Sequence, residues 1–109
     1  MSAAYLTVEE APTRAEVDQT SGLVLLEFGT DWCGICRASA PYIASLLARH
    51  PTVRHVKVAD GPGQALGRSF RVKLWPNLVF LRDGAVVRQL ARPTHADLEE
   101  AFQALVQPE

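Results

Sequence analysis

The segment Leu23–Phe28 reads Leu-Val-Leu-Leu-Glu-Phe and is apolar at almost every position. A strand with one face in water alternates apolar and polar residues, whereas a strand covered on both faces is nearly continuously apolar. We therefore expect this segment to be a central strand of a sheet with helices on both faces. Its one charged residue, Glu27, then places a carboxyl group inside an apolar strand.

The remaining chain supplies the neighbours that such a strand needs. The expected elements are a strand at Tyr5–Val8, a helix from Pro12 or Thr13 to about Gln19, the strand Leu23–Phe28, a helix from Cys33 to about Arg49 with Pro41 inside it, a strand at Val53–Val58, a helix at Gln64–Ser69, strands at Leu78–Leu81 and Ala85–Leu90, and a helix after Thr94. This β-α-β-α-β-α-β-β-α order predicts an α/β fold, with a mixed central β-sheet flanked by helices on both faces.

Helix starts are marked by residues that hydrogen-bond free backbone N–H groups. Thr13 with Glu16, and Thr94 with Asp97, fit the spacing of capping boxes. Asp31 is expected to cap the helix that begins near Cys33. The last helix carries apolar residues at helical spacing, which predicts a face that docks on the sheet: Leu98, Ala101, Phe102 and Leu105.

The length of 109 residues fits one compact domain, residues 1–109. A net charge of −1 argues against a general nucleic-acid binder, and no apolar run approaches the roughly 20 residues of a membrane span. The first ten residues lack the basic start and apolar core of a signal peptide. We expect a cytoplasmic monomer, in a compartment where thiols stay largely reduced.

Cys33 and Cys36 are the only cysteines of the chain. A disulfide between them closes a very short loop, so the pair is no structural framework. Cys33 lies where a strand ends and a helix begins, and the free N–H groups and dipole there stabilise a thiolate. Cys36 falls one turn deeper on the same side of the helix. The spacing therefore supplies an attacking thiol and a resolving thiol.

Two other interpretations of this pair stay open. Both cysteines fit as small buried apolar residues. A zinc site needs four ligands, and His50, His55 and His95 show no ligand spacing, so we expect no metal and no cofactor within the chain. A metal site shared between molecules is a further alternative.

The chain resembles the thioredoxin family over nearly its full length. The matching residues are Glu27-Phe28, Asp31-Trp32-Cys33-Gly34-Ile35-Cys36-Arg37, Ala40-Pro41, Phe70-Arg71-Val72, Trp75-Pro76 and Asp83-Gly84. A Trp-Cys-Gly-x-Cys string followed by a basic residue, together with a distant proline before a strand, is far more specific than a lone Cys-x-x-Cys.

The resemblance implies a role for each matching residue. Cys33 is the nucleophile, Cys36 is the resolving thiol, and the two form the redox disulfide. Pro76 is expected to be cis and to face the cysteines, with the backbone of Trp75 pairing with an extended substrate. Glu27 stands where the family has a buried acid that exchanges protons with the resolving cysteine, although a carboxylate that reaches solvent at the strand edge is the alternative.

Substrate contacts are implied at Trp32, Gly34 and Ile35, and three positions depart from the family. Ile35 replaces the usual proline, which is expected to alter the redox potential. Trp75 replaces a smaller residue, either to cover the disulfide or stack on a substrate, or as ordinary packing. Arg92 stands where the family has a glycine in its substrate-contact surface.

The charge around the expected site is predominantly basic. Residues 49–92 carry nine lysines and arginines against Asp60 and Asp83. Interspersed surface charge is the simpler interpretation, and a dedicated acidic partner is the alternative. Near Arg92 we expect a basic rim formed by Arg37, Arg71 and Lys73.

A lysine of the family lies near the buried acid, on the strand that here carries His55 and Lys57. These two residues share one face because they are two positions apart. Counting from the apolar residues places His55 at the lysine position. We hypothesise that His55 pairs with Glu27, which would make thiol exchange sensitive to pH between about 5 and 8. A solvent-facing histidine is the alternative.

The sequence thus predicts a protein dithiol–disulfide oxidoreductase acting in electron transport and cell redox homeostasis. Its expected partners are protein disulfide substrates and a thioredoxin-reductase-like electron donor. The alternative is an adaptor or assembly chaperone with this fold, which binds a specific partner with little redox turnover; Ile35, Trp75 and Arg92 keep it open.

Overall fold

A computed structural model describes residues 4–108 of the chain. Its elements are α1 (Arg14–Asp18), β1 (Leu23–Gly29), α2 (Gly34–Arg49), β2 (Val53–Ala59), α3 (Ala65–Ser69), β3 (Asn77–Arg82), β4 (Ala85–Ala91) and α4 (His95–Val106). Each of these elements was expected from the sequence, to within one or two residues at its ends.

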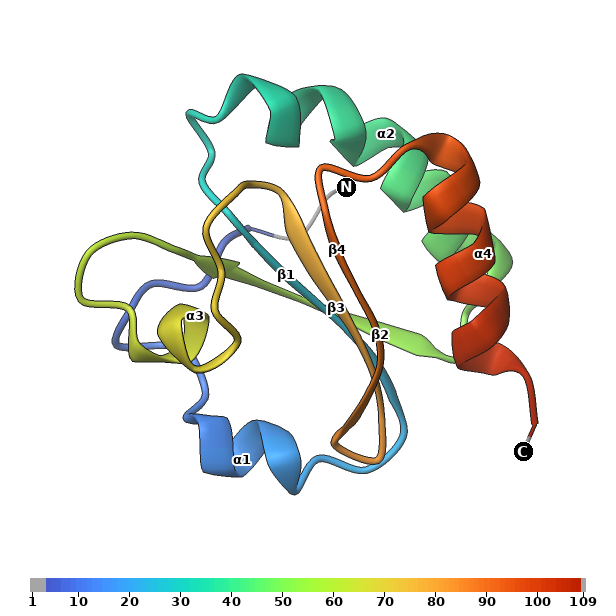
Figure 1. Ribbon diagram of the computed structural model, residues 1–109, viewed down its shortest axis with the longest axis horizontal. Helices are drawn as coiled ribbons and strands as arrows, with labels where there is room; N and C mark the ends of the chain where they lie inside the picture. Colours follow the sequence, from blue (N-terminus) through green and yellow to red (C-terminus); the bar gives the residue numbers. More distant parts are fainter. Residues whose placement is uncertain (1–3, 109) are drawn as a thin grey trace.

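The four strands form one mixed sheet in the order β2-β1-β3-β4 (Figure 1). β1 pairs with β2 in parallel and with β3 antiparallel, and β3 pairs antiparallel with β4. β1 therefore lies inside the sheet, and its residues from Val24 to Gly29 are all buried. The predicted α/β class and mixed central sheet are confirmed.

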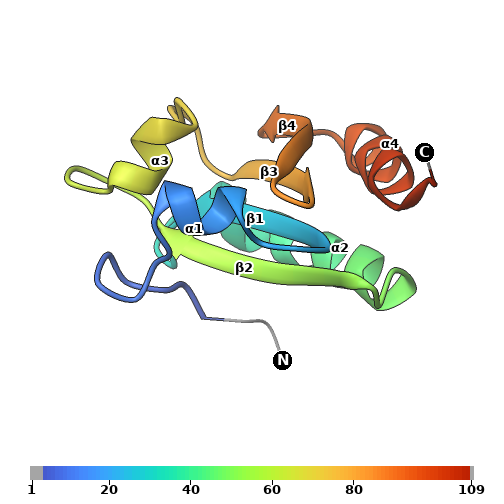
Figure 2. The ribbon, with the colours of Figure 1, turned by 90° about the horizontal axis from the view of Figure 1, so that it is seen from below.

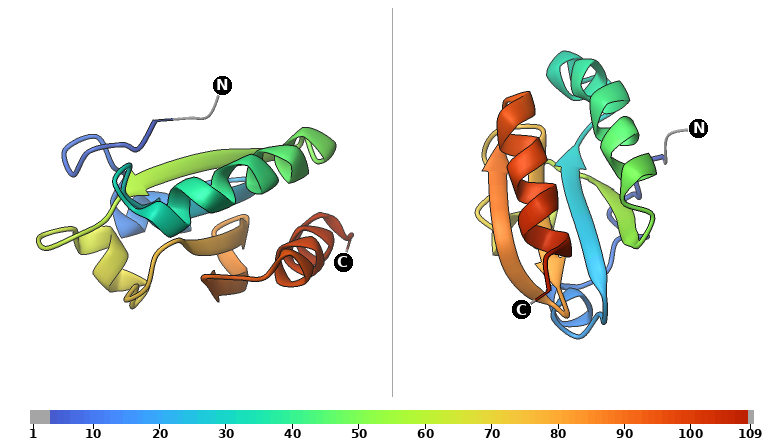
Figure 3. Two further views of the ribbon diagram at one scale, coloured as in Figure 1. Left: turned by 90° about the horizontal axis from the view of Figure 1, so that it is seen from above. Right: turned by 90° about the vertical axis from the view of Figure 1, so that its right-hand side faces the viewer.

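Helices cover both faces of the sheet, as Figures 2 and 3 show from opposite sides. On one face, α2 and α4 bury Ile43, Leu46 and Phe102 against Leu25 and Phe80. On the other face, α1 and α3 pack over the alternate residues of the strands, among them Val24, Leu26 and Val79. The doubly apolar pattern of β1 is explained by these two cores.

The first expected strand, Tyr5–Val8, is reduced to a single parallel bridge between Leu6 and Val58. The backbone N–H of Leu6 donates to the carbonyl of Lys57 at 2.8 Å, and the N–H of Ala59 donates to the carbonyl of Leu6 at 2.9 Å. The chain then turns, because the carbonyl of Thr7 accepts from residues 10 and 11. One bridged residue nevertheless fixes the N-terminal segment along the outer edge of β2.

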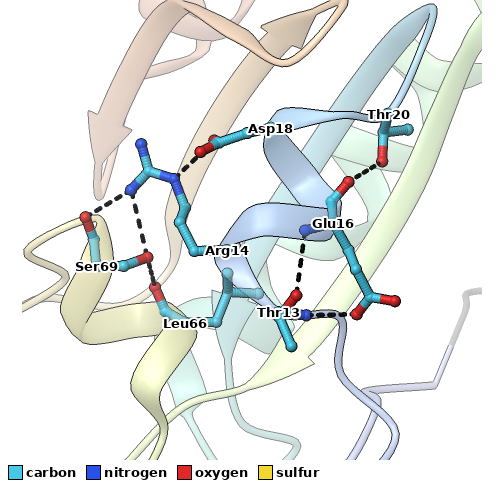
Figure 4. A network of polar contacts seen from close by, with 7 residues as sticks. All are labelled: Thr13, Arg14, Glu16, Asp18, Thr20, Leu66 and Ser69. Atoms are coloured by element: carbon cyan, nitrogen blue, oxygen red, sulfur yellow. Dashed lines mark hydrogen bonds and ion pairs between the residues drawn. The ribbon is translucent and has the colours of Figure 1, made fainter.

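Arg14 ties α1 to α3 through several contacts (Figure 4). Its Nε donates to Asp18 at 2.9 Å, and its Nη1 donates to the backbone carbonyl of Ser69 at 2.7 Å. Its guanidinium also lies 3.9 Å from the centre of the Phe70 ring. Figure 4 also shows the Thr13–Glu16 capping box at the start of α1.

The capping boxes at Thr13 and Thr94 are confirmed, but the cap predicted for α2 is wrong. The N-cap residue of α2 is Cys33, not Asp31, because the Cys33 sulfur accepts a hydrogen bond from the backbone N–H of Cys36. Asp31 lies two residues too early to reach that first turn. The helix then continues through Pro41 to Arg49.

The core beneath α4 depends on Phe102, which is fully buried and lies edge-on to Phe80 with ring centres 5.2 Å apart. We expect Phe102→Ala to lower the free energy of unfolding by about 3–5 kcal/mol, because it removes apolar contacts and leaves a cavity. Urea unfolding followed by circular dichroism measures this change. Gln103→Ala, on the exposed side of the same helix, is the control, and an equal loss in both variants would contradict the assignment.

Candidate active site

The two sulfurs lie at the junction of β1 and α2, at the end of the sheet where the segment before β3 also arrives (Figure 1). Cys33 is half-buried, and its Sγ lies 3.2 Å from the backbone nitrogen of Cys36. Both cysteines are free thiols. The motif therefore places two reduced sulfurs on the first turn of a helix, where backbone N–H groups have no helical partner.

The pKa of Cys33 lies below that of an ordinary thiol. Burial acts against ionisation, but it is outweighed by hydrogen bonds from the Cys36 side chain and from the backbone of Cys36 and Ile35, together with the charge of Arg92. The backbone N–H groups of Cys36 and Ile35 are those that a helix start offers a thiolate, and the Cys36 side chain and Arg92 add to their effect. Cys33 is therefore the more reactive sulfur near neutral pH.

Cys36 has the opposite character, with a side chain only 2% exposed. Burial, followed by the hydrogen bond with Cys33, raises the pKa of Cys36 to about 11, while hydrogen bonds with the Thr30 backbone and the Tyr5 side chain act in the lowering direction. A buried thiol of this kind stays protonated until a base or a hydrogen-bond donor assists its ionisation.

A proline with a cis peptide bond, Trp75–Pro76, directly precedes β3. The Trp75 ring lies edge-on to that of Trp32, with ring centres 5.6 Å apart, and its Nε1 donates to Asp60 at 2.9 Å. Trp32 itself is 73% exposed and Ile35 43% exposed. The surface next to the cysteines is thus built from two tryptophans and an isoleucine.

Arg92 connects this surface to the end of β4. Its backbone N–H donates to the carbonyl of Pro76 at 2.9 Å, and its side-chain Nε donates to the carbonyl of Trp75 at 2.8 Å. Its backbone is left-handed, with φ of 48°, a conformation that glycine adopts at no steric penalty. The other members of the expected basic rim are all exposed: Arg37, Arg71 and Lys73.

The side chains of Glu27, His55 and Lys57 lie on the α2 face of the sheet. Nε2 of His55 is 2.8 Å from Oε1 of Glu27, which is itself 2% exposed, so these two hypothesised partners are in contact. The register corrects one detail. Lys57, and not His55, lies directly opposite Glu27, because Leu25 is the partner of His55.

Tyr5 is the residue of this site that sequence reasoning missed. Its hydroxyl and the Cys36 sulfur both lie beside Gly29, and the Nζ of Lys57 lies 4.2 Å from the centre of its ring. Tyr5 reaches the cysteines only because Leu6 bridges to β2. No local sequence pattern predicts this contact, because α1 and β1 separate Tyr5 from Cys36 along the chain.

Among residues 4–108, no three histidine, cysteine or acidic side chains gather as the ligands of a metal ion would. A cavity of about 710 Å³ is lined by the N-terminal segment, α1 and β2, with Leu6, Val17 and Val56 in its wall. Neither cysteine nor Trp75 contributes to this cavity, so it is separate from the two sulfurs.

Among residues 4–108, no helix has both the length and the apolar character needed to cross a membrane.

The family model for thioredoxin matches residues 4–104. The chain belongs to the thioredoxin family. It is 53% identical to thioredoxin 2 from Pseudomonas aeruginosa PAO1, whose structure was determined in the reduced form. The superposition of the two structures covers 97% of each chain and has a TM-score of 0.84. Thioredoxin H5 of Oryza sativa subsp. japonica is 30% identical over 88% of this chain and 71% of its own length. Thioredoxin H-type 1 of Nicotiana tabacum is 32% identical over 81% and 68%.

The predicted family and activity are confirmed by these relatives and by the paired sulfurs. The chain is a dithiol–disulfide oxidoreductase with a thioredoxin fold, and thioredoxins act on disulfides in protein substrates. Cys33 and Cys36 lie close together, as a Cys-x-x-Cys motif requires.

Arg92 is expected to tune the reactivity of Cys33, since its charge lowers the pKa of that thiol. Replacement by a neutral side chain, Arg92→Gln, raises this pKa and leaves less thiolate near neutral pH. We expect alkylation of Cys33 by iodoacetamide to slow by at most about fivefold at low salt, because Arg92 is exposed and screened by solvent.

Arg92→Lys is the matched control, because it keeps the charge and changes the hydrogen-bonding geometry. The rates of all three proteins should converge at alkaline pH, where Cys33 is fully ionised. A rate for Arg92→Gln equal to that of the wild type at low salt would contradict the electrostatic role.

Proposed function

We propose that Cys33 attacks disulfides in protein substrates and that Cys36 resolves the mixed disulfide that forms. The observation that carries this assignment is the opposite pKa shift of two sulfurs on one helical turn, lowered at Cys33 and raised to about 11 at Cys36. Cys33, the less buried thiol, ionises first, and the buried Cys36 remains protonated. An attacking and a resolving thiol need this order of ionisation.

The two steps exchange sulfur–sulfur bonds and conserve electrons. The Cys33 thiolate forms a bond with one substrate sulfur, and the other substrate sulfur leaves as a thiolate that takes a proton. Cys36 then loses its proton and attacks Cys33, which releases the second substrate thiol. The substrate is reduced to two thiols, while Cys33 and Cys36 are oxidised to a disulfide that an electron donor must reduce again.

Glu27 is the proposed acceptor of the Cys36 proton. It is a buried carboxyl group on β1, on the face covered by α2, and its Oε1 lies 2.8 Å from Nε2 of His55. A base in this position is required because Cys36 is protonated near neutral pH. His55 orients the carboxyl group, and Lys57 supplies positive charge on the same face.

Substrate backbone is proposed to dock between Trp32, Ile35 and the Trp75–Pro76 peptide, with Gly34 leaving access to Cys33. An incoming strand competes with Arg92 for the carbonyl of Trp75, which already accepts a hydrogen bond from the Arg92 side chain. The guanidinium, once displaced, is free to pair with an acidic group of the substrate. We also propose a thioredoxin-reductase-like electron donor and a cytoplasmic location.

Reduction of insulin disulfides, with dithiothreitol as electron donor, tests the roles of the two sulfurs. The wild type should catalyse the reaction, and Cys33→Ser should lose it because no nucleophile remains. Cys36→Ser should form mixed disulfides that persist, which mass spectrometry detects. A wild type that reduces nothing under these conditions would instead favour the adaptor, in which the fold binds a partner without turnover.

The contact of His55 with Glu27 predicts a pH dependence for thiol exchange. The hypothesis made from the sequence places this dependence between about pH 5 and 8. We expect His55→Ala to alter the pH profile of insulin reduction between these limits. His55→Gln is the matched control, because it retains a hydrogen-bonding side chain that does not titrate; a profile unchanged in both variants rules the hypothesis out.

A further inference from the structure

The hydroxyl of Tyr5 and the sulfur of Cys36 meet above Gly29. A Cβ atom placed on Gly29 would lie 2.7 Å from the Cys36 Sγ and 3.0 Å from the Tyr5 Oη. The first of these distances is a clash, and the second is tighter than an ordinary contact. Glycine at this position therefore leaves the space that lets the phenol reach the buried thiol.

Tyr5 is held in place from two directions. The neighbouring Leu6 is fixed to β2 by two backbone hydrogen bonds, to Lys57 and Ala59. The Nζ of Lys57 lies 4.2 Å from the centre of the Tyr5 ring, which is a cation–π distance. A half-buried ring that is held in this way keeps its hydroxyl directed at one partner.

The phenol remains protonated over the whole working range of the protein. Burial raises the pKa of Tyr5, and the nearby Glu27 and Cys36 raise it further. A protonated hydroxyl beside a sulfur donates its hydrogen bond best when that sulfur carries a negative charge. The direction of its effect on Cys36 agrees, because the hydrogen bond from Tyr5 acts to lower the pKa of that thiol.

We propose that Tyr5 is a catalytic residue of the resolving step, in which its hydroxyl donates a hydrogen bond to the Cys36 sulfur as that sulfur becomes a thiolate. Tyr5 keeps its own proton throughout, and the proton of Cys36 passes to Glu27. The thiolate then attacks Cys33, the bond from Cys33 to the substrate breaks, and the substrate leaves as a thiol after taking up a proton.

Other charged groups lie around Cys36. The hydrogen bond with Cys33 and the negative charge of the Cys33 thiolate both raise the pKa of Cys36. Glu27 and His55 lie on the sheet face beneath α2, Lys57 on the Tyr5 ring, and Arg92 across the site beside Cys33. Among the described residues, Tyr5 is the side chain whose hydrogen bond lowers the pKa of Cys36.

The test separates the two sulfur steps in one experiment. Reduced protein is mixed with a dipyridyl disulfide, and the release of thiopyridone is followed by stopped-flow absorbance. The first release reports the attack by Cys33, and the second reports the resolution by Cys36. Tyr5→Phe removes only the hydroxyl and retains the ring that packs against Lys57, so the fold is expected to be preserved.

We expect Tyr5→Phe to slow the second release by about threefold near neutral pH and to leave the first unchanged. A rise of one unit in the pKa of Cys36 lowers its thiolate fraction about tenfold, and the more basic thiolate regains about threefold in nucleophilicity. The difference between the second-release rates of the wild type and Tyr5→Phe should narrow as the pH approaches about 11, where Cys36 of the wild type ionises.

Two further variants act as controls. Tyr42→Phe removes the hydroxyl of the other tyrosine, which lies on α2 and donates to Glu99 of α4, and should change neither release. Gly29→Ala is a positive control for disturbance of the resolving thiol, because the added Cβ atom would lie 2.7 Å from the Cys36 sulfur. It should slow the second release both in the wild type and in the Tyr5→Phe background.

This inference rests on the sulfur roles proposed above, and the two phases keep their failures apart. A wild type without a second release contradicts the resolving role of Cys36 itself. A second release that is unchanged in Tyr5→Phe, or slowed equally with the first, or slowed without any change in its pH profile, contradicts the role of Tyr5.

Discussion

The hydrogen bond from the backbone of Cys36 to the sulfur of Cys33 is the interaction on which the rest of the site depends. It makes Cys33, the proposed nucleophile, the N-cap of α2, so a sulfur replaces the side-chain oxygen that usually fills this place. A negative sulfur is stabilised by the helix start, and the helix start gains the partner that it lacks. This one hydrogen bond therefore both caps the helix and stabilises the Cys33 thiolate.

The same turn of helix separates two environments only three residues apart. Cys33 faces a surface of exposed tryptophan, isoleucine and arginine, whereas Cys36 faces the sheet and is almost fully buried. Burial alone would leave Cys36 inert. The sheet beside α2 instead carries buried polar groups that are rare in such a core: Glu27 contacts His55, and Lys57 lies over the ring of Tyr5.

The surface proposed to face the substrate departs from the thioredoxin pattern, as the sequence had indicated. An arginine in a left-handed conformation occupies a position where the family has glycine, and its side chain binds the carbonyl of Trp75. The Trp75 indole donates a hydrogen bond to Asp60 and packs against Trp32. Trp75 is therefore held in place as part of an aromatic surface. Partner choice is thus expected to depend on an aromatic and basic surface.

Much of this protein was determined by its sequence alone, because the deciding signals are local. The doubly apolar run at Leu23–Phe28, the capping boxes and the Cys-x-x-Cys spacing at a strand–helix junction each act over a few residues, and they predicted the sheet, the helix starts and the two thiols. Tertiary structure decided what no local pattern encodes. Pairing register placed Lys57 opposite Glu27, a single bridge replaced the first strand, and that bridge delivered Tyr5 to Cys36. These contacts join residues that only the folded sheet brings together.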